Sequence, residues 1–305
     1  MKVLVFGSNG WIGQQFIELL QADSARQVIP ASVRADDEEA VGRLLDEVRP
    51  THVASFIGRT HGGSFNTIDY LEQPGKLVEN VRDNLYAPVS IGLLCAERGI
   101  HVTSIGTGCI FAADDPTVSN YDENAKPDFF GSAYSTVKGF TDRLLHSPHL
   151  ANSVLNVRIR MPIVDTHHPR NFITKIMGYA KVCSIPNSMT VLPELLPLVV
   201  DMMERERVGT INLTNPGIIS HNEILGMYRD LVDPAYTWEN FSIEEQNQIL
   251  LSKRSNNQLD TTKLHEWYPQ VTPIHEAVRR CVAAMGPRRE PSLAQSSQRA
   301  LAPLP

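Results

Sequence analysis

Tyr134 and Lys138 form the pattern YxxxK, which places a phenol and an ammonium group four residues apart. On a helix, residues i and i+4 lie on one face, so both side chains can reach the same cleft. A free tyrosine has a pKa of about 10, and a neighbouring ammonium group favours its phenolate. Such a tyrosine can exchange a proton with a carbonyl oxygen while hydride is transferred at the carbon. Because YxxxK is common by chance, its position in the fold decides its meaning.

A second pattern, Gly7-Ser-Asn-Gly10-Trp-Ile-Gly13, follows a short apolar run and opens a helical stretch. Glycines at this spacing permit a tight turn and a close backbone approach to a pyrophosphate. The free N–H groups and the positive end of the helix dipole favour an anion there. The pattern predicts a dinucleotide-binding loop, and the alternative is a structural turn rich in glycine.

The charge after the second predicted strand distinguishes the two nicotinamide cofactors. An acidic residue binds the 2′-hydroxyl of NAD, whereas an arginine accommodates the 2′-phosphate of NADP. Arg34 is the first charged residue in this segment, which favours NADPH. In the alternative, Arg34 is a solvated loop residue and Asp36 reads the ribose.

The rest of the N-terminal half supplies the elements that must position these residues. Runs rich in β-branched residues predict strands at Lys2–Phe6, Gln27–Pro30, His52–Phe56, His101–Ile105 and Val154–Ile159. Helical spacing alternates with them at Ile12–Gln21, Asp37–Val48, Gly75–Glu97 and Ala133–His146. This rhythm predicts an α/β fold, namely a Rossmann doubly wound parallel sheet covered by helices on both faces.

Beyond Met161-Pro162 the chain becomes mostly helical, with helices expected at Leu195–Arg205, His221–Val232 and Pro273–Ala284. We therefore expect an NADP-binding domain over 1–163 and a smaller, mostly helical substrate domain over most of 164–285. A strand near 209–214 should return to the main sheet. The tail, 286–305, is rich in Pro, Ser, Gln and Arg, which predicts disorder.

Composition excludes several classes of protein. A net charge of −6 argues against a nucleic-acid groove. The sequence contains no run of about 18 apolar residues, so no membrane span is expected. The four cysteines form no CxxC pair, so free thiols and a cytoplasmic location are expected. The adjacent His167 and His168 rarely converge on one ion, and no metal site is expected.

Longer segments carry a more specific resemblance. The chain resembles the bifunctional 3,5-epimerase/4-reductases of UDP-rhamnose synthesis, within the extended short-chain dehydrogenase/reductases that include dTDP-4-dehydrorhamnose reductases and GDP-fucose synthase. The similarity covers nearly the whole chain except the tail. The supporting segments are GWIG (10–13), GTGCIF (106–111), FFGSAYSTVK (129–138), RIRMPI (158–163), PRNFITKI (169–176), IPNSMT (185–190), NLTNPGIISHNEIL (212–225) and RSNNQLD (254–260).

The resemblance implies a reaction and a set of site residues. In UDP-4-keto-6-deoxyglucose, the 4-keto group acidifies the protons at C3 and C5. Both carbons are inverted, and NADPH then reduces C4 to give UDP-L-rhamnose. Thr107 would complete the reductase site with Tyr134 and Lys138, and Lys138 would also hold the nicotinamide ribose. Further residues implied to bind or organise the cofactor site are Gly7, Gly10, Trp11, Ile12, Gly13, Gly58, Asn84 and Pro162.

Epimerisation needs an acid/base pair that a plain reductase lacks. Cys109 lies two residues after Thr107, where GDP-fucose synthase similarly has a cysteine and the plain reductases have tyrosine. A nearby cation can lower the pKa of a thiol from about 8.5. Lys181 is the partner implied by resemblance to the plant-type enzymes. In the alternatives, Cys109 is buried and inert, and Lys181 only contacts phosphate or solvent.

Substrate contacts are expected from three segments. Arg170 could clamp a diphosphate bidentately, and the other candidates are Arg59, Thr60, Asn171, Asn187 and Ser188. By analogy within the superfamily, the helices near 77–97 and 133–146 would form a homodimer interface. A UDP-glucose 4,6-dehydratase would be a pathway neighbour. Two rival functions remain: a reductase without epimerase activity, and a non-catalytic dinucleotide-binding regulatory subunit.

Overall fold

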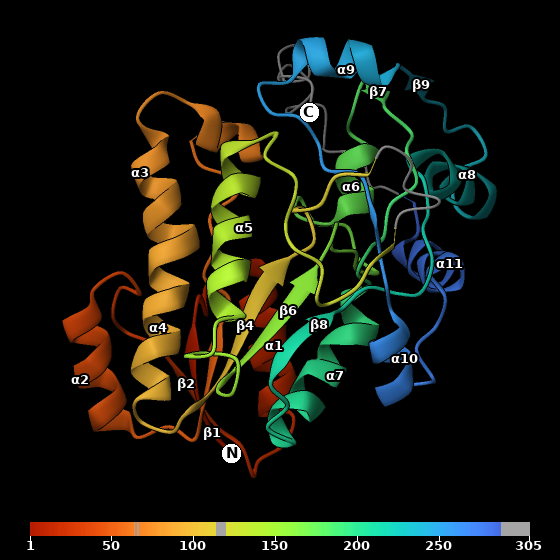
Figure 1. Cartoon of the computed structure of the whole chain (residues 1–305). Helices are drawn as coiled ribbons and strands as arrows, with labels where there is room; N and C mark the ends of the chain where they lie inside the picture. Colours follow the sequence, from red (N-terminus) through yellow and green to blue (C-terminus); the bar gives the residue numbers. More distant parts are fainter. Residues whose placement is uncertain (64, 66, 114–119, 288–305) are drawn as a thin grey trace.

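The computed structural model describes residues 1–63, 65, 67–113 and 120–287, and within them one parallel sheet forms the centre of the molecule (Figure 1). Its strand order is β2 (Gln27–Pro30), β1 (Lys2–Phe6), β3 (His52–Ser55), β4 (His101–Thr107), β6 (Val154–Ile159) and β8 (Gly209–Asn212). Each neighbouring pair is parallel. The chain places β2 and β3 on opposite sides of β1, so the order reverses between β1 and β3.

Helices cover both faces of this sheet. One face packs against α1 (Trp11–Gln21), α7 (Leu192–Glu204) and α10 (Thr262–Trp267). The other packs against α2 (Glu38–Val48), α4 (Ala87–Ala96) and α5 (Ala133–Leu145). Side chains alternate along β1 accordingly: Val3 and Val5 join the first cluster, whereas Leu4 and Phe6 join the second. The predicted doubly wound sheet is confirmed.

The helix expected at Gly75–Glu97 contains an irregular turn. It divides into α3 (Lys76–Val81), a π-helical turn at Arg82–Tyr86, and α4. Pro88 lacks an N–H and cannot donate to the carbonyl of Asn84. The Thr141 hydroxyl of α5 donates to that carbonyl instead, at 2.6 Å. The irregular turn thereby fixes Asn84 beside the strand ends.

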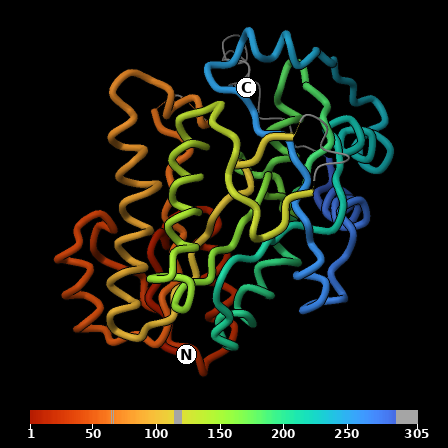
Figure 2. The backbone as a smooth tube through the Cα atoms, in the orientation of Figure 1, coloured from red at the N-terminus to blue at the C-terminus, as the bar shows by residue number. Residues whose placement is uncertain are grey.

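A second layer of structure lies beyond the carboxyl ends of the strands. Its core contains α6 (Phe172–Ile176), α8 (His221–Leu231) and α11 (Ile274–Met285). Two short pairs of strands accompany it: β7 (Lys181–Val182) with β9 (Glu239–Asn240), and β5 (Asn120–Tyr121) with β10 (Gln258–Leu259). Figure 2 shows the chain entering this layer after β6, returning to the sheet as β8, and entering it again through α8, which is followed by α9 (Ile243–Ile249).

Several boundaries differ from the predicted ones. β4 extends to Thr107, because the sheet pairing with β6 continues two residues past the apolar run. α7 begins at Leu192, three residues early, after Ile163 and Val191 pair. No helix in the described part of the chain is long and apolar enough to cross a membrane. Disorder is predicted for the tail, whose residues from 288 onward lie outside the described part of the chain.

Candidate active site

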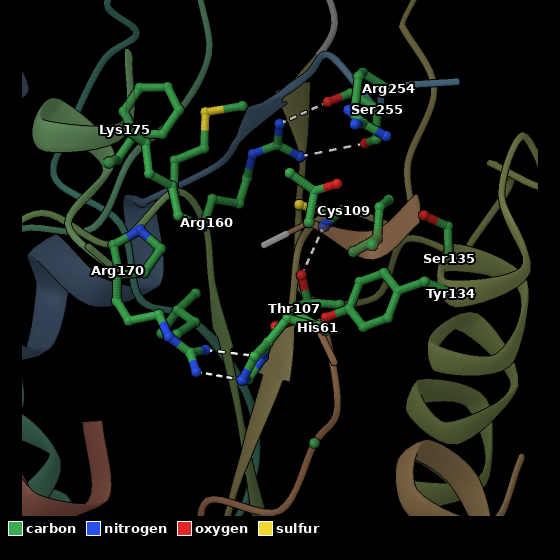
Figure 3. Close-up of a pocket in the computed structure, with 18 of the residues that line it drawn as sticks. His61, Thr107, Cys109, Tyr134, Ser135, Arg160, Arg170, Lys175, Arg254 and Ser255 are labelled. Atoms are coloured by element: carbon green, nitrogen blue, oxygen red, sulfur yellow. Dashed lines mark hydrogen bonds between the residues drawn. The ribbon is translucent and has the colours of Figure 1, made fainter. Parts of the chain in front are cut away.

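A pocket opens at the carboxyl ends of the strands, beside the point where the strand order reverses. Ligands of open α/β sheets bind at such a position. One end of the pocket is lined by residues 10–13 of the glycine-rich loop, and its middle by the YxxxK pair. Its other end is formed by α6, by residues 181–185 and by the start of α8. Figure 3 shows the middle and the far end together.

The glycine-rich loop has the backbone that its spacing predicts. Gly7 has φ +73°, and a Cβ there would lie 2.8 Å from the carbonyl carbon of Phe56. A Cβ on Gly13 would lie 2.3 Å from the oxygen of Gly7. The turn therefore admits no side chain at either position, and the start of α1 stays open toward the pocket. Trp11 and Ile12 also line it.

Arg34 lies at the edge of this region rather than among the residues that line the pocket. Its side chain is 66 % exposed and pairs with Asp36 at 2.8 Å. Asp36 also lies 3.5 Å from Arg82. Asp36 is thus flanked by two arginines, of which Arg82 also pairs with Asp83 at 2.8 Å. Arg34 is left at the surface, where its guanidinium can contact a phosphate.

Thr107, Tyr134 and Lys138 converge in the middle of the pocket. Thr107 ends β4, and Tyr134 lies in the first turn of α5, whose N-terminus is capped by the Ser132 hydroxyl. Burial raises the pKa of Tyr134, a nearby thiolate charge at Cys109 would raise it further, and a hydrogen bond with Thr107 lowers it. Burial is the largest of these causes, and it favours the protonated form of Tyr134. That the Lys138 ammonium group favours the phenolate stays a prediction.

Lys138 lies one helical turn after Tyr134 and is buried. Burial lowers its pKa to about 8, and the carboxylate of Asp142 offsets part of that effect. Asp142 in turn accepts two hydrogen bonds from the buried Arg158, at 2.7 and 2.8 Å. The carboxylate of this buried ion pair therefore favours the charged form of Lys138.

Cys109 lies in the turn after β4 and lines the same pocket. Its backbone N–H donates to the Thr107 hydroxyl at 3.1 Å, so the turn holds both side chains at one strand end. The other cysteines, Cys95, Cys183 and Cys281, are buried, and burial raises the pKa of each thiol. Cys109 differs from all three in being partly accessible.

The far end of the pocket is cationic. Arg170, Lys175 and Arg254 line it, with His61 between the sheet and Arg170. The Arg170 guanidinium contacts both ring nitrogens of His61, one at 2.9 Å (Figure 3). Burial lowers the pKa of Lys175, and the charges of Arg170 and Arg254 lower it further. Among the described residues that line the pocket, none is an aspartate or a glutamate, but Arg254 pairs with Asp69 behind it at 3.0 Å. Arg170 and Lys175 make this end suitable for a diphosphate.

Lys181, the implied partner of Cys109, lines the pocket at its edge. It is half exposed at the rim of the pocket and pairs with Glu239 of β9 at 3.5 Å. Lys175 points into the interior from α6, and its ammonium group is largely desolvated. The five residues between Lys175 and Lys181 carry no sequence signal that tells the two lysines apart, because the difference arises from the packing of α6.

Arg59 and Asn84 support the pocket from behind. The Arg59 side chain forms ion pairs with Asp83 and Glu79, both at 2.8 Å, and does not line the pocket. The expectation that Arg59 lines the sugar pocket is therefore corrected. The carboxamide of Asn84 bonds the backbone N–H and carbonyl of residue 59, each at 2.9 Å. Gly58 and Thr60, on either side, do line the pocket, as does Pro162.

Asn171, Asn187 and Ser188 are structural rather than pocket-lining residues. Asn171 caps α6 by accepting from the N–H of Ile173. Asn187 and Ser188 are fully buried and bond the side chain of Arg160 through an amide oxygen and a backbone carbonyl. Their expected contact with substrate is therefore corrected. Their polar groups satisfy other buried groups instead.

Sequence reasoning missed several residues that line the pocket. They are His61, Arg160, Lys175, Tyr179, Arg254, Ser255 and Asn256. Arg160, Lys175 and Arg254 lie inside segments that carried the family resemblance, so their positions were marked without a role. His61 and Tyr179 offered no spacing signal. No cluster of His, Cys, Asp or Glu within the described residues could hold a metal ion.

Comparison with known proteins agrees with this geometry. The model of the RmlD substrate binding domain family matches residues 1–184. A UDP-rhamnose synthase from Acanthamoeba polyphaga mimivirus is 52 % identical, and its crystal structure superposes with a TM-score of 0.91 over 93 % of this chain and 99 % of that chain.

Two plant proteins are also similar. A bifunctional dTDP-4-dehydrorhamnose 3,5-epimerase/reductase from Arabidopsis thaliana is 40 % identical over 92 % of this chain and 91 % of its own length. A trifunctional UDP-glucose 4,6-dehydratase/3,5-epimerase/reductase from the same plant is 38 % identical over 95 % of this chain, which spans 42 % of that protein. The chain therefore belongs to the RmlD-like family of nucleotide-sugar 3,5-epimerase/4-keto reductases.

Proposed function

We propose that this enzyme converts UDP-4-keto-6-deoxyglucose to UDP-L-rhamnose, by inversion at C3 and C5 followed by NADPH-dependent reduction at C4. The observation that carries the proposal is that a partly accessible thiol, Cys109, lies in one pocket with Thr107, Tyr134 and Lys138. A plain reductase needs the last three and has no use for the first.

For reduction, the residues of this chain bind the sugar and supply a proton. NADPH, when bound along the glycine-rich loop, supplies the hydride. Tyr134 donates its proton to the C4 oxygen, and its raised pKa keeps that proton in place until the oxygen becomes basic. The Thr107 hydroxyl holds the phenol and the carbonyl oxygen in one plane of hydrogen bonds. The positive charge of Lys138 stabilises the phenolate that remains.

For epimerisation, an acid and a base must face opposite sides of the sugar ring. Cys109 removes the proton beside the 4-keto group, and the electron pair moves to the C4 oxygen as an enolate. We propose Lys175 as the acid that protonates the opposite face, in place of Lys181. Its ammonium group is largely desolvated inside the pocket, which favours loss of a proton, whereas Lys181 is half exposed at the rim.

The nucleotide and the cofactor occupy opposite ends of the pocket in this proposal. Arg170 holds the diphosphate at the cationic end, together with Arg254, which Asp69 orients from behind. Arg34 holds the 2′-phosphate of NADPH outside the other end. The corresponding division of the chain is a cofactor domain over 1–163 with the strand near 209–214, and a substrate domain over most of 164–285.

We also propose a homodimer in the cytoplasm. The face formed by α3, α4 and α5 exposes large apolar side chains, which a second copy would cover by the same face. These side chains are Leu77, Val78, Leu93, Phe140 and Leu144. The free thiol of Cys109 requires a reducing compartment. A 4,6-dehydratase activity must supply the 4-keto substrate.

Deuterium exchange tests the function directly. Pure enzyme is incubated with UDP-4-keto-6-deoxyglucose in D2O, with and without NADPH, and C3 and C5 are followed by NMR. We expect deuterium at both carbons without NADPH, and UDP-rhamnose once NADPH is added. Consumption of NADPH with no ring deuterium would instead identify a plain reductase. Absence of both exchange and oxidation would rule out this substrate.

Two variants separate the two chemistries in the same assay. Cys109→Ala should lose exchange while still reducing an already epimerised 4-keto sugar. Tyr134→Phe should keep exchange and lose about 10²–10⁴-fold in reduction, the usual contribution of a general acid. Lys175→Met and Lys181→Met form a matched pair, of which only Lys175→Met should abolish exchange. The opposite result would return the acid role to Lys181.

A further inference from the structure

Arg160 is a fully buried arginine directly after β6, and its role is not accounted for by the reactions above. Its guanidinium donates to the carbonyls of Gly108 at 2.7 Å and Ser255 at 2.9 Å, and to the amide oxygen of Asn187 at 2.5 Å. The Ser188 carbonyl and the Ser255 hydroxyl accept longer bonds. All of these acceptors are neutral, and no carboxylate in the described part of the chain pairs with this arginine.

A buried positive charge of this kind is expensive unless something negative compensates it. Arginine cannot lose its proton to escape the penalty. The neutral acceptors satisfy its N–H groups but leave its net charge in place. The remaining charge is therefore available to an anion formed in the pocket, which Arg160 also lines.

The thiolate of Cys109 is the candidate for this anion. Arg160 holds the carbonyl of Gly108, the residue between Thr107 and Cys109. A Cβ on Gly108 would lie 3.0 Å from the Arg160 side chain, so the turn is packed against the arginine stem. Burial lowers the pKa of Arg160, and the charge of Cys109 acts in the opposite direction. Figure 3 shows Arg160 and Cys109 on the same side of the pocket.

Other charged groups face the same space. Tyr134 approaches Cys109 from α5 and is neutral at pH 7 because its pKa is raised. Lys175 of α6 and Arg254 of the segment after α9 line the far side. Arg160 differs from these two in being bonded to the backbone of the turn that carries Cys109.

We propose that Arg160 is the positioning residue for Cys109: it fixes the turn at Gly108 and holds an uncompensated positive charge beside the thiol, so that the thiolate is present at neutral pH. The inference rests on the proposed role of Cys109 as the epimerisation base. In that step the thiolate forms an S–H bond as the sugar C–H bond breaks, and the electron pair becomes the enolate. The resulting thiol returns its proton to water.

Reduction shares the turn that carries Thr107, but it does not use the thiolate. In the proposed reduction Tyr134 and Thr107 act on the C4 oxygen, and the carboxylate of Asp142 favours the charged form of Lys138. Loss of the Arg160 charge should therefore change the ratio of epimerisation to reduction. A merely structural role would lower both activities together.

The first measurement uses the wild-type enzyme with no sugar. The rate of Cys109 alkylation by iodoacetamide is followed against pH by mass spectrometry of the Cys109 peptide. The midpoint should lie clearly below the value of about 8.5 for an ordinary thiol. A midpoint at or above that value overturns the proposal. This result is independent of whether any nucleotide sugar is a substrate.

The second measurement compares variants. Arg160→Gln should raise the alkylation midpoint by about one pH unit, which lowers the rate at pH 6.5 about tenfold. Arg160→Lys, which keeps the charge, should have a midpoint between those of the wild type and Arg160→Gln. Arg170→Gln removes the same charge from the far end and should shift the midpoint much less. An unchanged midpoint in folded Arg160→Gln contradicts the proposal, and if that variant does not fold, the wild-type midpoint decides.

The third measurement is the activity split. In Arg160→Gln, ring deuterium incorporation should fall at least about tenfold at pH 7, with its pH profile shifted upward. Reduction of an already epimerised substrate should stay within about threefold of wild type. Equal loss of both activities would assign Arg160 a structural role only. A wild-type enzyme with a low thiol midpoint but no exchange would contradict the proposed function instead.

Discussion

Arg158 and Arg160 are two residues apart and equally buried, yet their surroundings differ in kind. Arg158, within β6, points toward α5 and pairs with the carboxylate of Asp142 at 2.7 Å. Arg160, just past the strand end, points toward the pocket and meets only neutral acceptors. A carboxylate neutralises the charge of Arg158, whereas the groups that bond Arg160 leave its positive charge uncompensated beside the pocket. Arg158 therefore supports the fold, and Arg160, in our proposal, serves the site.

A third arginine, Arg34, lies at the surface. Arg34 is exposed, and its pair with Asp36 is largely solvated. Surface pairs contribute little to stability, whereas removal of one member of a buried pair is strongly destabilising. The three positions therefore predict effects of different size and kind.

The largest effect is expected in the buried pair. Asp142→Ala should lower the free energy of unfolding by about 3–5 kcal/mol, because Arg158 is left buried without its carboxylate. Urea denaturation followed by circular dichroism measures the change. The double variant Asp142→Leu/Arg158→Met, which removes both charges, should recover most of the loss. If the double variant were no more stable than Asp142→Ala, the pair would not be the cause.

A second prediction uses the link between Asp142 and Lys138. Burial lowers the pKa of Lys138 to about 8, so its positive charge is lost above that pH. The rate of NADPH-dependent reduction should therefore fall above about pH 8, by roughly tenfold for each further pH unit. Initial rates over pH 6.5–9.5 test this. A rate that stays flat to pH 9.5 would show that the charge of Lys138 is not needed.

A third prediction concerns the exposed arginine. Arg34→Ala should reduce the preference for NADPH over NADH about tenfold, through a higher KM for NADPH, and leave thermal stability unchanged. The phosphate contact is lost, but no buried group is left unpaired. Arg43, an exposed arginine of α2, provides the matched control: Arg43→Ala should alter neither property. A loss of stability in Arg34→Ala would contradict the comparison.

The smallest effect is expected at the opposite end of the sheet. His52 and His101 are buried there with rings 5.4 Å apart, and burial lowers the pKa of both. Unlike arginine, histidine can be buried as a neutral group. Below about pH 6.5 the unfolded chain binds protons that the folded chain does not, so stability should decline as pH falls. Unfolding of His52→Gln at pH 7.5 and 5.0 should show a shallower decline than wild type.

The sequence by itself determined the parts of this protein that depend on local spacing. The turn at Gly7 needs positive φ, and YxxxK needs only a helix to bring Tyr134 and Lys138 to one face. The parallel sheet likewise follows from short apolar runs that alternate with helical ones. Each of these signals acts within a few residues and survives without knowledge of the rest of the chain.

Only the tertiary structure decided which of the remaining polar residues enter the pocket. Nothing in the sequence separates Lys175 from Lys181, but the packing of α6 largely desolvates Lys175, whereas Lys181 stays half exposed beside β9. Asn187 lies in a segment shared with the family and yet faces away, toward Arg160. Desolvation and the partners of a buried charge are set by segments far apart along the chain, such as 108, 160 and 255. Local spacing carries no record of them, because they arise only when those segments pack together.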